Sequence, residues 1–217
     1  GIVIYHGDCR EVLPTLTEKV DLVLTDPPYG IGSIWSKGSE RHGWGKANAE
    51  GELRNEWDAS PPATETIELC LSMGRDAVVW GGNYFSLPPA RGWLVWNKPE
   101  RGFSLSEAEL AWTTRDNVIR VFDCNRSDTG RQHPTQKPLS LMLWCLSLFP
   151  NAQTVLDPFM GSGTTLVAAK QLGRKAIGIE ICEAYAEIAA KRLAQEVLPL
   201  TTQKEDERYV TKEICTV

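Results

Sequence analysis

Residues 155–165, VLDPFMGSGTT, join a short β-branched run to a glycine-rich turn and the start of a helical pattern. Such a unit lets a ligand approach the backbone closely, because glycine has no side chain and the amides at a helix start are free. A dinucleotide-binding turn would need glycine in place of Leu166, and a P-loop would need the lysine that Gly163-Thr164-Thr165 lacks. The stretch therefore predicts an α/β fold with a nucleoside site that holds no diphosphate.

Short β-branched runs alternate with helical patterns along the rest of the chain, which is typical of a sheet covered by helices on both faces. The expected strands are residues 2–5, 21–25, 77–80, 93–96, 109–113, 118–122, 154–157 and 175–179. The expected helices are residues 11–16, 63–73, 139–149, 163–172 and 183–197. The three strands between residues 93 and 122 have no long helix between them, so we expect a β-meander at one edge of the sheet.

The composition is that of a globular protein and excludes several functional classes. The 217 residues are 42% hydrophobic and 24% charged, and a net charge of -5 excludes a uniformly basic nucleic-acid coat protein. None of the six cysteines belongs to a C-x-x-C pair, so neither a zinc site nor a disulfide framework is predicted. The longest apolar stretch, residues 139–149, is shorter than the roughly 20 residues of a membrane span. We expect a soluble, cytoplasmic protein without a metal.

The tetrapeptide Asp26-Pro27-Pro28-Tyr29 directly follows the expected buried strand 21–25. Ligands of open α/β sheets bind at the carboxyl ends of the strands, and two prolines fix the backbone and leave a carbonyl that no local N–H can claim. The tetrapeptide thus offers a carboxylate, a free carbonyl and an aromatic ring to a planar heterocycle with an exocyclic amino group. The alternative is a structural turn in which Asp26 caps and Tyr29 packs.

A second acid, Glu180, follows the expected strand 175–179. An acid at this position accepts hydrogen bonds from the two hydroxyls of a ribose in dinucleotide-binding folds. The alternative is a charge that interacts favourably with the dipole of the following helix.

Two segments contain basic residues suited to DNA. The glycine-rich loop 30–62 carries Trp35 and Trp44 between basic side chains, and residues 97–136 carry a second basic set. Basic side chains beside aromatic ones suit phosphate contact together with base stacking. The candidate DNA-binding residues are Lys37, Arg41, Lys46, Arg115, Arg126 and Arg131. The alternative for loop 30–62 is a flexible lid whose charges are solvated.

In this order, the motifs resemble those of the amino-group DNA methyltransferases that use S-adenosyl-L-methionine. The match is to the permuted (beta) class, in which D-P-P-Y precedes D-P-F-x-G-S-G. Residues 5–9 (YHGDC) resemble the strand end that meets the adenine of the cofactor in this family. Residues 133–138 (HPTQKP) resemble its H-P-T-x-K-P segment, which starts the helix beside the methionine end. The resemblance covers nearly the whole chain, roughly residues 4–193.

The resemblance implies a class I methyltransferase fold, which is Rossmann-like and here circularly permuted. It would have three layers around a mostly parallel, seven-stranded sheet with one antiparallel strand and helices on both faces. We expect a single domain over residues 1–198, with a flexible loop at 30–62, a candidate target-recognition region at 97–136 and a polar tail at 199–217. Since 97–136 is short, we expect a short or relaxed target sequence, with a homodimer supplying further surface. The resemblance places the protein on double-stranded DNA in a bacterial cell, with the bacterium or a phage encoding it.

The resemblance also assigns roles to residues. Asp26 and the carbonyl of Pro27 would accept the two N–H hydrogens of the target amine, while Tyr29, after Pro28, would stack on a base flipped out of the duplex. Asp8 and Cys9 would lie near the adenine of the cofactor, Glu180 on its ribose, and Thr135 and Lys137 near its methionine carboxylate. The full implied cofactor set is Asp8, Cys9, Asp26, Thr135, Lys137, Asp157, Pro158, Phe159, Gly161, Ser162, Gly163, Thr164, Thr165, Glu180 and Ile181.

The predicted reaction is methylation of the exocyclic N6 of adenine in DNA. Asp26 favours adenine N6 over cytosine N4, because the cytosine-N4 members of the family more often carry serine at that position. An RNA or protein-glutamine methyltransferase is a less favoured enzyme, since the glutamine enzymes resemble N-P-P-Y and place the cofactor motif first. A nucleoside- or DNA-binding relative without activity is the alternative from another class, and the complete catalytic motif argues against it.

Overall fold

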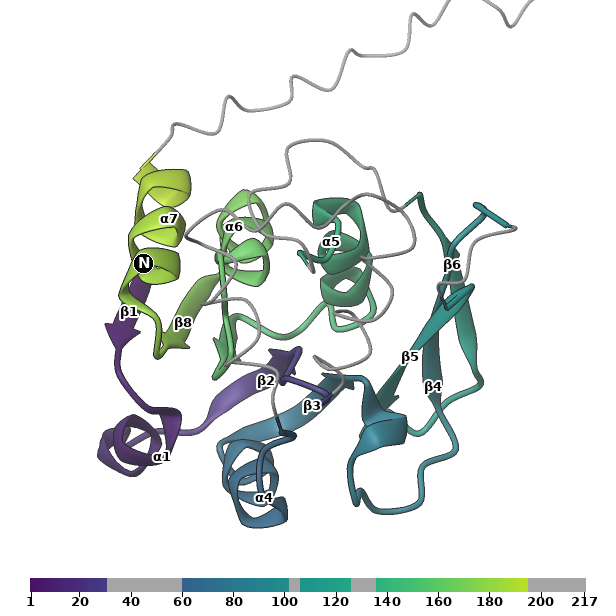
Figure 1. The fold of residues 1–217 in the computed structure, drawn as a ribbon, viewed down its shortest axis with the longest axis horizontal. Helices are drawn as coiled ribbons and strands as arrows, with labels where there is room; N and C mark the ends of the chain where they lie inside the picture. The colour runs from purple at the N-terminus through teal and green to yellow at the C-terminus, as the bar shows by residue number, and fades with distance from the viewer. Residues whose placement is uncertain (31–59, 102–105, 126–135, 195–217) are drawn as a thin grey trace, which may run out of the picture.

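The computed structural model describes residues 1–30, 60–101, 106–125 and 136–194 (Figure 1). Within these residues, eight strands form one sheet in the order β1-β8-β7-β2-β3-β5-β4-β6. The strands are β1 (Ile2–His6), β2 (Val20–Thr25), β3 (Gly74–Trp80), β4 (Trp93–Asn97), β5 (Ala108–Thr113), β6 (Arg120–Asp123), β7 (Thr154–Asp157) and β8 (Lys175–Glu180). The helices are α1 (Cys9–Val12), α4 (Thr64–Ser72), α5 (Leu139–Ser147), α6 (Thr164–Gln171) and α7 (Glu183–Ala194), with 3-10 turns η1 (Leu13–Thr15) and η3 (Gly82–Tyr84).

Helices cover both faces of the sheet, as predicted: α5, α6 and α7 lie on one face and α1 and α4 on the other (Figure 1). The alternation of side chains along the strands explains this arrangement. Leu22 and Leu24 of β2 pack in the core on the side of α5, α6 and α7, whereas Val23 packs on the side of α1 and α4. All three are fully buried, so β2 reads as the continuous apolar run of a central strand.

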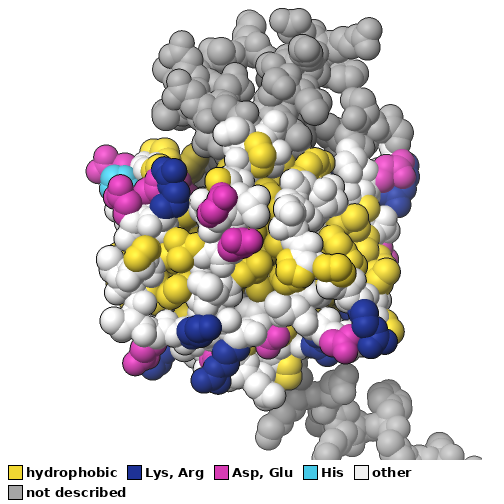
Figure 2. Space-filling view, turned by 90° about the horizontal axis from the view of Figure 1, so that it is seen from below, with side chains coloured by type: hydrophobic (Ala, Val, Ile, Leu, Met, Phe, Trp, Pro, Cys, Tyr) yellow, Lys and Arg dark blue, Asp and Glu magenta, His cyan; other side chains and the backbone are white. Residues whose placement is uncertain are grey.

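The face that carries α1 and α4 exposes apolar side chains. Figure 2 views the molecule from below Figure 1 and shows hydrophobic side chains in broad areas, with charged side chains scattered around them. Val3 and Tyr5 of β1, which point away from the α7 side, are exposed there. The single-turn helix α1 therefore covers its end of the sheet incompletely.

The part of the sheet beyond β3 differs from two expectations, which are the number of strands and the β-meander. The resemblance implies seven strands and the structure has eight, because β6 adds to the outer edge of β4. The predicted β-meander is wrong, since β6 runs parallel to β4 and lies on the side of β4 away from β5. The physical reason is that β5 already pairs with β3 on one side and β4 on the other, so at this end of the sheet β6 can add only to the outer edge of β4. As the resemblance implies, β5 alone among these strands is antiparallel to its neighbours.

Element boundaries shift by a few residues from those expected. Strand β6 begins at Arg120 rather than at Val118, and Val118 and Ile119 are exposed. The first helix is shorter than expected and continues as the 3-10 turn η1, which has a proline at its start. In the part of the chain that the structure describes, no helix is long and apolar enough to cross a membrane.

The topological switch point of the sheet lies between β7 and β2, which are parallel neighbours. From β7 the chain crosses to β8 through α6 on one face, whereas from β2 it crosses to β3 through α4 on the other face. Connections that leave neighbouring strands on opposite faces open a crevice at the carboxyl ends of those strands, and ligands bind there. The residues directly after β2 and β7 are those of D-P-P-Y and of the glycine-rich turn.

Candidate active site

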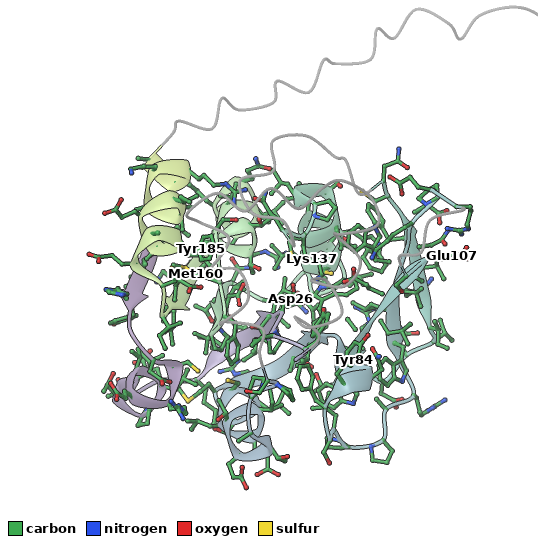
Figure 3. The ribbon with its side chains drawn as sticks, in the orientation of Figure 1. Asp26, Tyr84, Glu107, Lys137, Met160 and Tyr185 are labelled. Atoms are coloured by element: carbon green, nitrogen blue, oxygen red, sulfur yellow. The ribbon has the colours of Figure 1, made fainter. Side chains whose placement is uncertain are left out.

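Asp26, directly after β2, carries most of the contacts of the D-P-P-Y segment. Its carboxylate accepts a hydrogen bond from the Tyr29 hydroxyl, with 2.5 Å between the oxygens, and lies 2.5 Å from Lys137 Nζ. Lys137 Nζ is also 3.3 Å from the Tyr29 hydroxyl oxygen. Burial raises the pKa of Asp26, and the Lys137 ammonium opposes this shift. Figure 3 shows Asp26 and Lys137 close together at the centre of the molecule.

The ring of Tyr29 belongs to a small aromatic group beyond the end of β3. It stacks on Tyr84, with 4.8 Å between the ring centroids and 12° between the planes, and Phe85 meets it edge-on at 6.2 Å. Gly81 has a φ of 68°, and a Cβ at this position would collide with the Tyr29 ring. Glycine is therefore required twice over, for the left-handed backbone and for the approach of the ring. Sequence reasoning missed Tyr84, although its place just after a buried strand was a usable signal.

Asp157, the last residue of β7, is buried and forms no ion pair with the residues that the structure describes. Its carboxylate accepts hydrogen bonds from the Thr25 hydroxyl at 2.8 Å and from the Phe159 amide at 3.2 Å. Burial raises the pKa of Asp157 to about 6, although hydroxyl donors from Thr165 and Thr25 partly offset this effect. Pro158, next in the chain, is buried and Phe159 is half-buried. Asp157 thus ties the end of β7 to the end of β2.

Glu180, the last residue of β8, holds the other side of the glycine-rich turn. Its carboxylate accepts hydrogen bonds from the Gly161 amide at 2.9 Å and the Cys182 amide at 2.8 Å. Burial raises the pKa of Glu180 above its ordinary value. Its neighbour Ile181 is 64% exposed. The acid therefore does more than cap a helix, because it orders a backbone amide of the turn 19 residues earlier in the chain.

The end of β1 lies beside Glu180. His6 is in register with Glu180, and the Gly7 amide donates to the Glu180 carbonyl at 2.9 Å. Asp8 caps α1 by accepting from the Arg10 amide at 2.8 Å, and its carboxylate forms an ion pair with the Arg10 guanidinium at 2.5 Å. Cys9 is buried. Asp8 and Glu180 therefore stand at neighbouring strand ends, as the prediction of one nucleoside site requires.

The backbone of the glycine-rich turn is open at Gly161. Gly161 has a φ of 51°, and a Cβ added there would meet nothing within 4 Å. Gly163 is the N-cap of α6 and provides no side-chain cap to the first turn of that helix. The side chains around it are engaged by the protein itself: Arg192 donates to the Ser162 carbonyl and lies 3.2 Å from the Thr164 hydroxyl. Arg192 was not anticipated, since the sequence presents it only as one basic residue of a helix.

Residues 136–137 bridge the two motifs. The Ser162 hydroxyl lies 3.1 Å from Gln136 Oε1, while the next residue, Lys137, pairs with Asp26. With the Thr25–Asp157 hydrogen bond, this gives two connections between the D-P-P-Y segment and the glycine-rich turn. Both segments therefore lie together at the carboxyl ends of β2 and β7.

The structure does not bring every candidate residue to this end of the strands. Arg115 follows β5, which is antiparallel to β3, so Arg115 lies at the opposite end of the strands from Asp26. Its guanidinium is 5.8 Å from the centroid of the Phe149 ring. The remaining candidate residues outside the described ranges are Thr135, Lys37, Arg41, Lys46, Arg126 and Arg131.

Comparisons with known proteins agree with this geometry. A family model described as a DNA methylase (N6_N4_Mtase) matches residues 79–191. The chain is 51% identical over 248 residues to Type II methyltransferase M2.LlaDCHI of Lactococcus lactis subsp. cremoris, with 88% of each protein covered. It is 50% identical over 251 residues to Type II methyltransferase M2.DpnII of Streptococcus pneumoniae, with 90% of each covered.

A solved structure supports the same likeness. The crystal structure of an M1.HpyAVI-SAM complex matches with a TM-score of 0.57 and 25% sequence identity, over 88% of this chain and 100% of that one. The residues matched by the family model include Lys137, Asp157 and Glu180 but not Asp26. The D-P-P-Y segment therefore lies outside the match to the family model, and its description rests on its geometry.

Proposed function

The chain belongs to the N6_N4_Mtase family of DNA methylases and is a DNA amino-methyltransferase that uses S-adenosyl-L-methionine, and from this premise we propose that it methylates the exocyclic N6 of adenine. The observation that carries the proposal is the junction of the two motifs. The Thr25 hydroxyl donates to Asp157, so the carboxylate of Asp26 and the glycine-rich turn follow neighbouring, directly bonded strand ends. A methyl donor in the turn and an amine at Asp26 then share one crevice.

The residues of the turn and of the strand ends beside it suit the cofactor. The open backbone at Gly161 admits a ligand, and Glu180 forms no ion pair with a described residue, so its carboxylate can accept hydrogen bonds from ribose hydroxyls. We assign Asp8 and Cys9 to the adenine end and the start of α6 to the methionine end. When bound, S-adenosyl-L-methionine supplies an electrophilic methyl group on a sulfonium.

The D-P-P-Y segment prepares the nucleophile. The lone pair of an exocyclic amine is delocalised into its ring, so the amine is a poor nucleophile until its hydrogens are bound by acceptors. Asp26 and the Pro27 carbonyl would accept hydrogen bonds from the two N–H groups and so direct the lone pair out of the ring plane. Acceptors that stabilise charge developing only in the transition state raise the rate, and holding the reacting atoms in line contributes further.

The target base has to leave the duplex to reach Asp26. Tyr29 would stack on it, since Tyr29 is already held by the Asp26 carboxylate and by the Tyr84 ring. DNA contact is assigned to the basic residues of loop 30–62 and of the region 97–136, with Arg115 as a backbone contact away from the crevice. A homodimer in the cytoplasm of a bacterial host, as part of restriction-modification or phage protection, completes the proposal.

Adenine is preferred over cytosine because Asp26 stands at the first position of the motif. Methylation of cytosine N4 is the second candidate, and the family description covers both amines. The two differ in the product that remains in DNA, so they are separated by one chemical analysis.

The test uses the full chain, labelled S-adenosyl-L-methionine, plasmid DNA and total RNA. After the reaction the nucleic acid is digested to nucleosides, which are identified by mass, and Asp26→Ala serves as the inactive control. N6-methyldeoxyadenosine is the expected product. N4-methyldeoxycytidine would replace the adenine assignment by the cytosine one, and label found only in RNA would overturn both.

A further inference from the structure

Glu109 and Lys98 lie beside the active site yet belong to neither motif. Glu109 is in β5, where it is in register with Trp96 of β4, and Lys98 follows the end of β4. Lys98 Nζ forms an ion pair and a hydrogen bond with Glu109 Oε1. Lys137 Nζ lies 3.1 Å from Glu109 Oε2 and 2.5 Å from Asp26 Oδ2. The four side chains form a charge chain of alternating sign, which is Asp26, Lys137, Glu109 and Lys98.

The two cations of the charge chain are almost fully buried, unlike those of an ordinary surface pair, and the two carboxylates are partly buried. The side chains of Lys137 and Lys98 are only 8% and 7% exposed. Lysine is almost never buried to this degree without compensation, and here two anions balance two cations. Burial alone would raise the pKa of Glu109, but Lys137 and Lys98 outweigh it and bring it to about 2. Asp26 and Glu109 likewise raise the pKa of Lys137 above its ordinary value, so these groups keep their charges.

The geometry shows what Glu109 does for Lys137. A lysine ammonium sits on a flexible four-carbon stem and has three donors. The ammonium of Lys137 is held between Glu109 of β5 and Asp26, which directly follows β2. It lies 5.5 Å from the centroid of the Tyr29 ring. Lys98 in turn lies 4.5 Å from the centroid of the Trp96 ring, which fixes the far end of the charge chain on β4.

We propose that Glu109 and Lys98 are positioning residues which, through Lys137, hold the carboxylate of Asp26 in the orientation that accepts the hydrogens of the target amine. The inference rests on the proposed function of Asp26. It adds that the cationic partner of Asp26 is itself anchored from the opposite part of the sheet, from β5 and β4. Neither residue touches the reacting atoms, so we expect their substitution to lower kcat and to leave the binding of DNA and of the cofactor unchanged.

The test compares two matched pairs in the full chain. Glu109→Gln and Lys98→Met neutralise the buried pair, singly and together. Glu187→Gln and Lys191→Met do the same to an exposed pair on α7, which is 3.2 Å apart with side chains 62% and 76% exposed. Measurements are kcat and KM for plasmid methylation, the Kd for S-adenosyl-L-methionine by calorimetry, and the nitrogen-proton NMR signal of the Lys137 ammonium.

For Glu109→Gln we expect kcat to fall at least about 10-fold, with both KM values and the cofactor Kd within about 3-fold of wild type. The Lys137 ammonium signal should broaden or disappear in this variant. The double variant should lose no more than Glu109→Gln, because both act through one chain of contacts. Both α7 variants should retain wild-type kinetics.

The pH profile separates a charge effect from a packing effect. Four titratable groups act on Asp26. They are Lys137 from the segment before α5, Glu109 from β5, Asp157 from β7 and Tyr29 from the same loop as Asp26. Removing the negative charge of Glu109 should move the acidic limb of kcat to lower pH, and removing the positive charge of Lys98 should move it to higher pH. A purely structural role predicts no such opposite shifts.

Unchanged kcat in Glu109→Gln, with wild-type DNA methylation intact, would overturn the positioning role alone. Equal losses in kcat and in cofactor affinity would also overturn it, because they indicate general damage to the site. Should Glu109→Gln not fold, Glu109→Asp retains the charge with a shorter reach and is expected to lower kcat several-fold at an unchanged Kd. A wild-type protein that methylates no DNA would overturn the proposed function, and this inference with it.

Discussion

The D-P-P-Y half of the site, around Asp26, and its glycine-rich half, around Asp157, differ in the partners that stabilise their carboxylates. Asp26, after β2, is paired with the Lys137 ammonium and through it with Glu109. Asp157, at the end of β7, forms no ion pair with a described residue and depends on the Thr25 hydroxyl and the Phe159 amide. Burial raises the pKa of both acids. At Asp26 the Lys137 ammonium opposes this shift, whereas at Asp157 only hydrogen-bond donors oppose it and the pKa rises to about 6. The D-P-P-Y half therefore contains a cation beside its acid, whereas Asp157 has only hydrogen-bond donors among the described residues.

The largest effect should come from Asp26→Ala. It removes the acceptor of the target amine, so we expect kcat for DNA methylation to fall by about 1,000-fold or more. The Kd for the cofactor should change by less than about 3-fold, because the glycine-rich half keeps all its partners. Single-turnover kinetics and calorimetry provide the two numbers. A parallel loss of cofactor binding would show that the halves are not separable.

Asp157→Asn tests the glycine-rich half, where the buried acid forms no ion pair with a described residue. A raised pKa means that the folded state binds a proton more tightly than the unfolded chain, so the associated stability is present below about pH 4 and is lost as the pH rises through about 6. Asparagine mimics the protonated acid, so the variant should gain stability over wild type with rising pH, by up to about 3 kcal/mol at pH 8.

Urea denaturation at pH 5 and pH 8 measures this difference in the free energy of unfolding. Asp116→Asn is the control, because Asp116 is 71% exposed and its variant should show no divergence with pH. A gap between Asp157→Asn and wild type that is the same at both pH values would contradict the burial argument.

Glu180→Gln sharpens the comparison on the cofactor side. Replacing a charged acceptor by a neutral one should weaken cofactor binding by about 10- to 100-fold. At saturating cofactor, kcat should stay within about 3-fold of wild type, since Asp26 and its charge chain are untouched. Calorimetry and steady-state kinetics test both statements. Wild-type affinity would mean that Glu180 only orders the Gly161 and Cys182 amides.

The smallest effect is expected for Tyr84→Leu. Loss of the stack on Tyr29 removes about 1 kcal/mol of ring interaction, which we expect to appear as an increase of about 5-fold in the KM for DNA. Tyr84→Phe keeps the ring and should match wild type, and cofactor affinity should be unchanged in both. A change in cofactor affinity instead would place Tyr84 in the wrong half of the crevice.

Most elements were predictable because their signals are local. Strand β2 was visible as an unbroken apolar run, and α6 as a helix opening from a glycine turn. The position of β6 was not predictable, because a strand of four residues pairs with whichever sheet edge is left free. The protein partners of Lys137 were not predictable from the sequence either, since its ammonium faces Asp26 and Glu109, which are distant along the chain. Its approach to the methionine carboxylate stays a prediction.

The residues themselves determined the chemistry available to this protein: a D-P-P-Y motif, a glycine-rich turn and an acid at a strand end. Those are properties of short segments, where backbone geometry and side-chain type act over a few residues. Only the tertiary structure decided that Asp26 would pair with Lys137, 111 residues away, and that Asp157 would instead accept hydrogen bonds from Thr25 and Phe159. Electrostatic energy depends on distance and burial in space, and separation along the chain constrains neither.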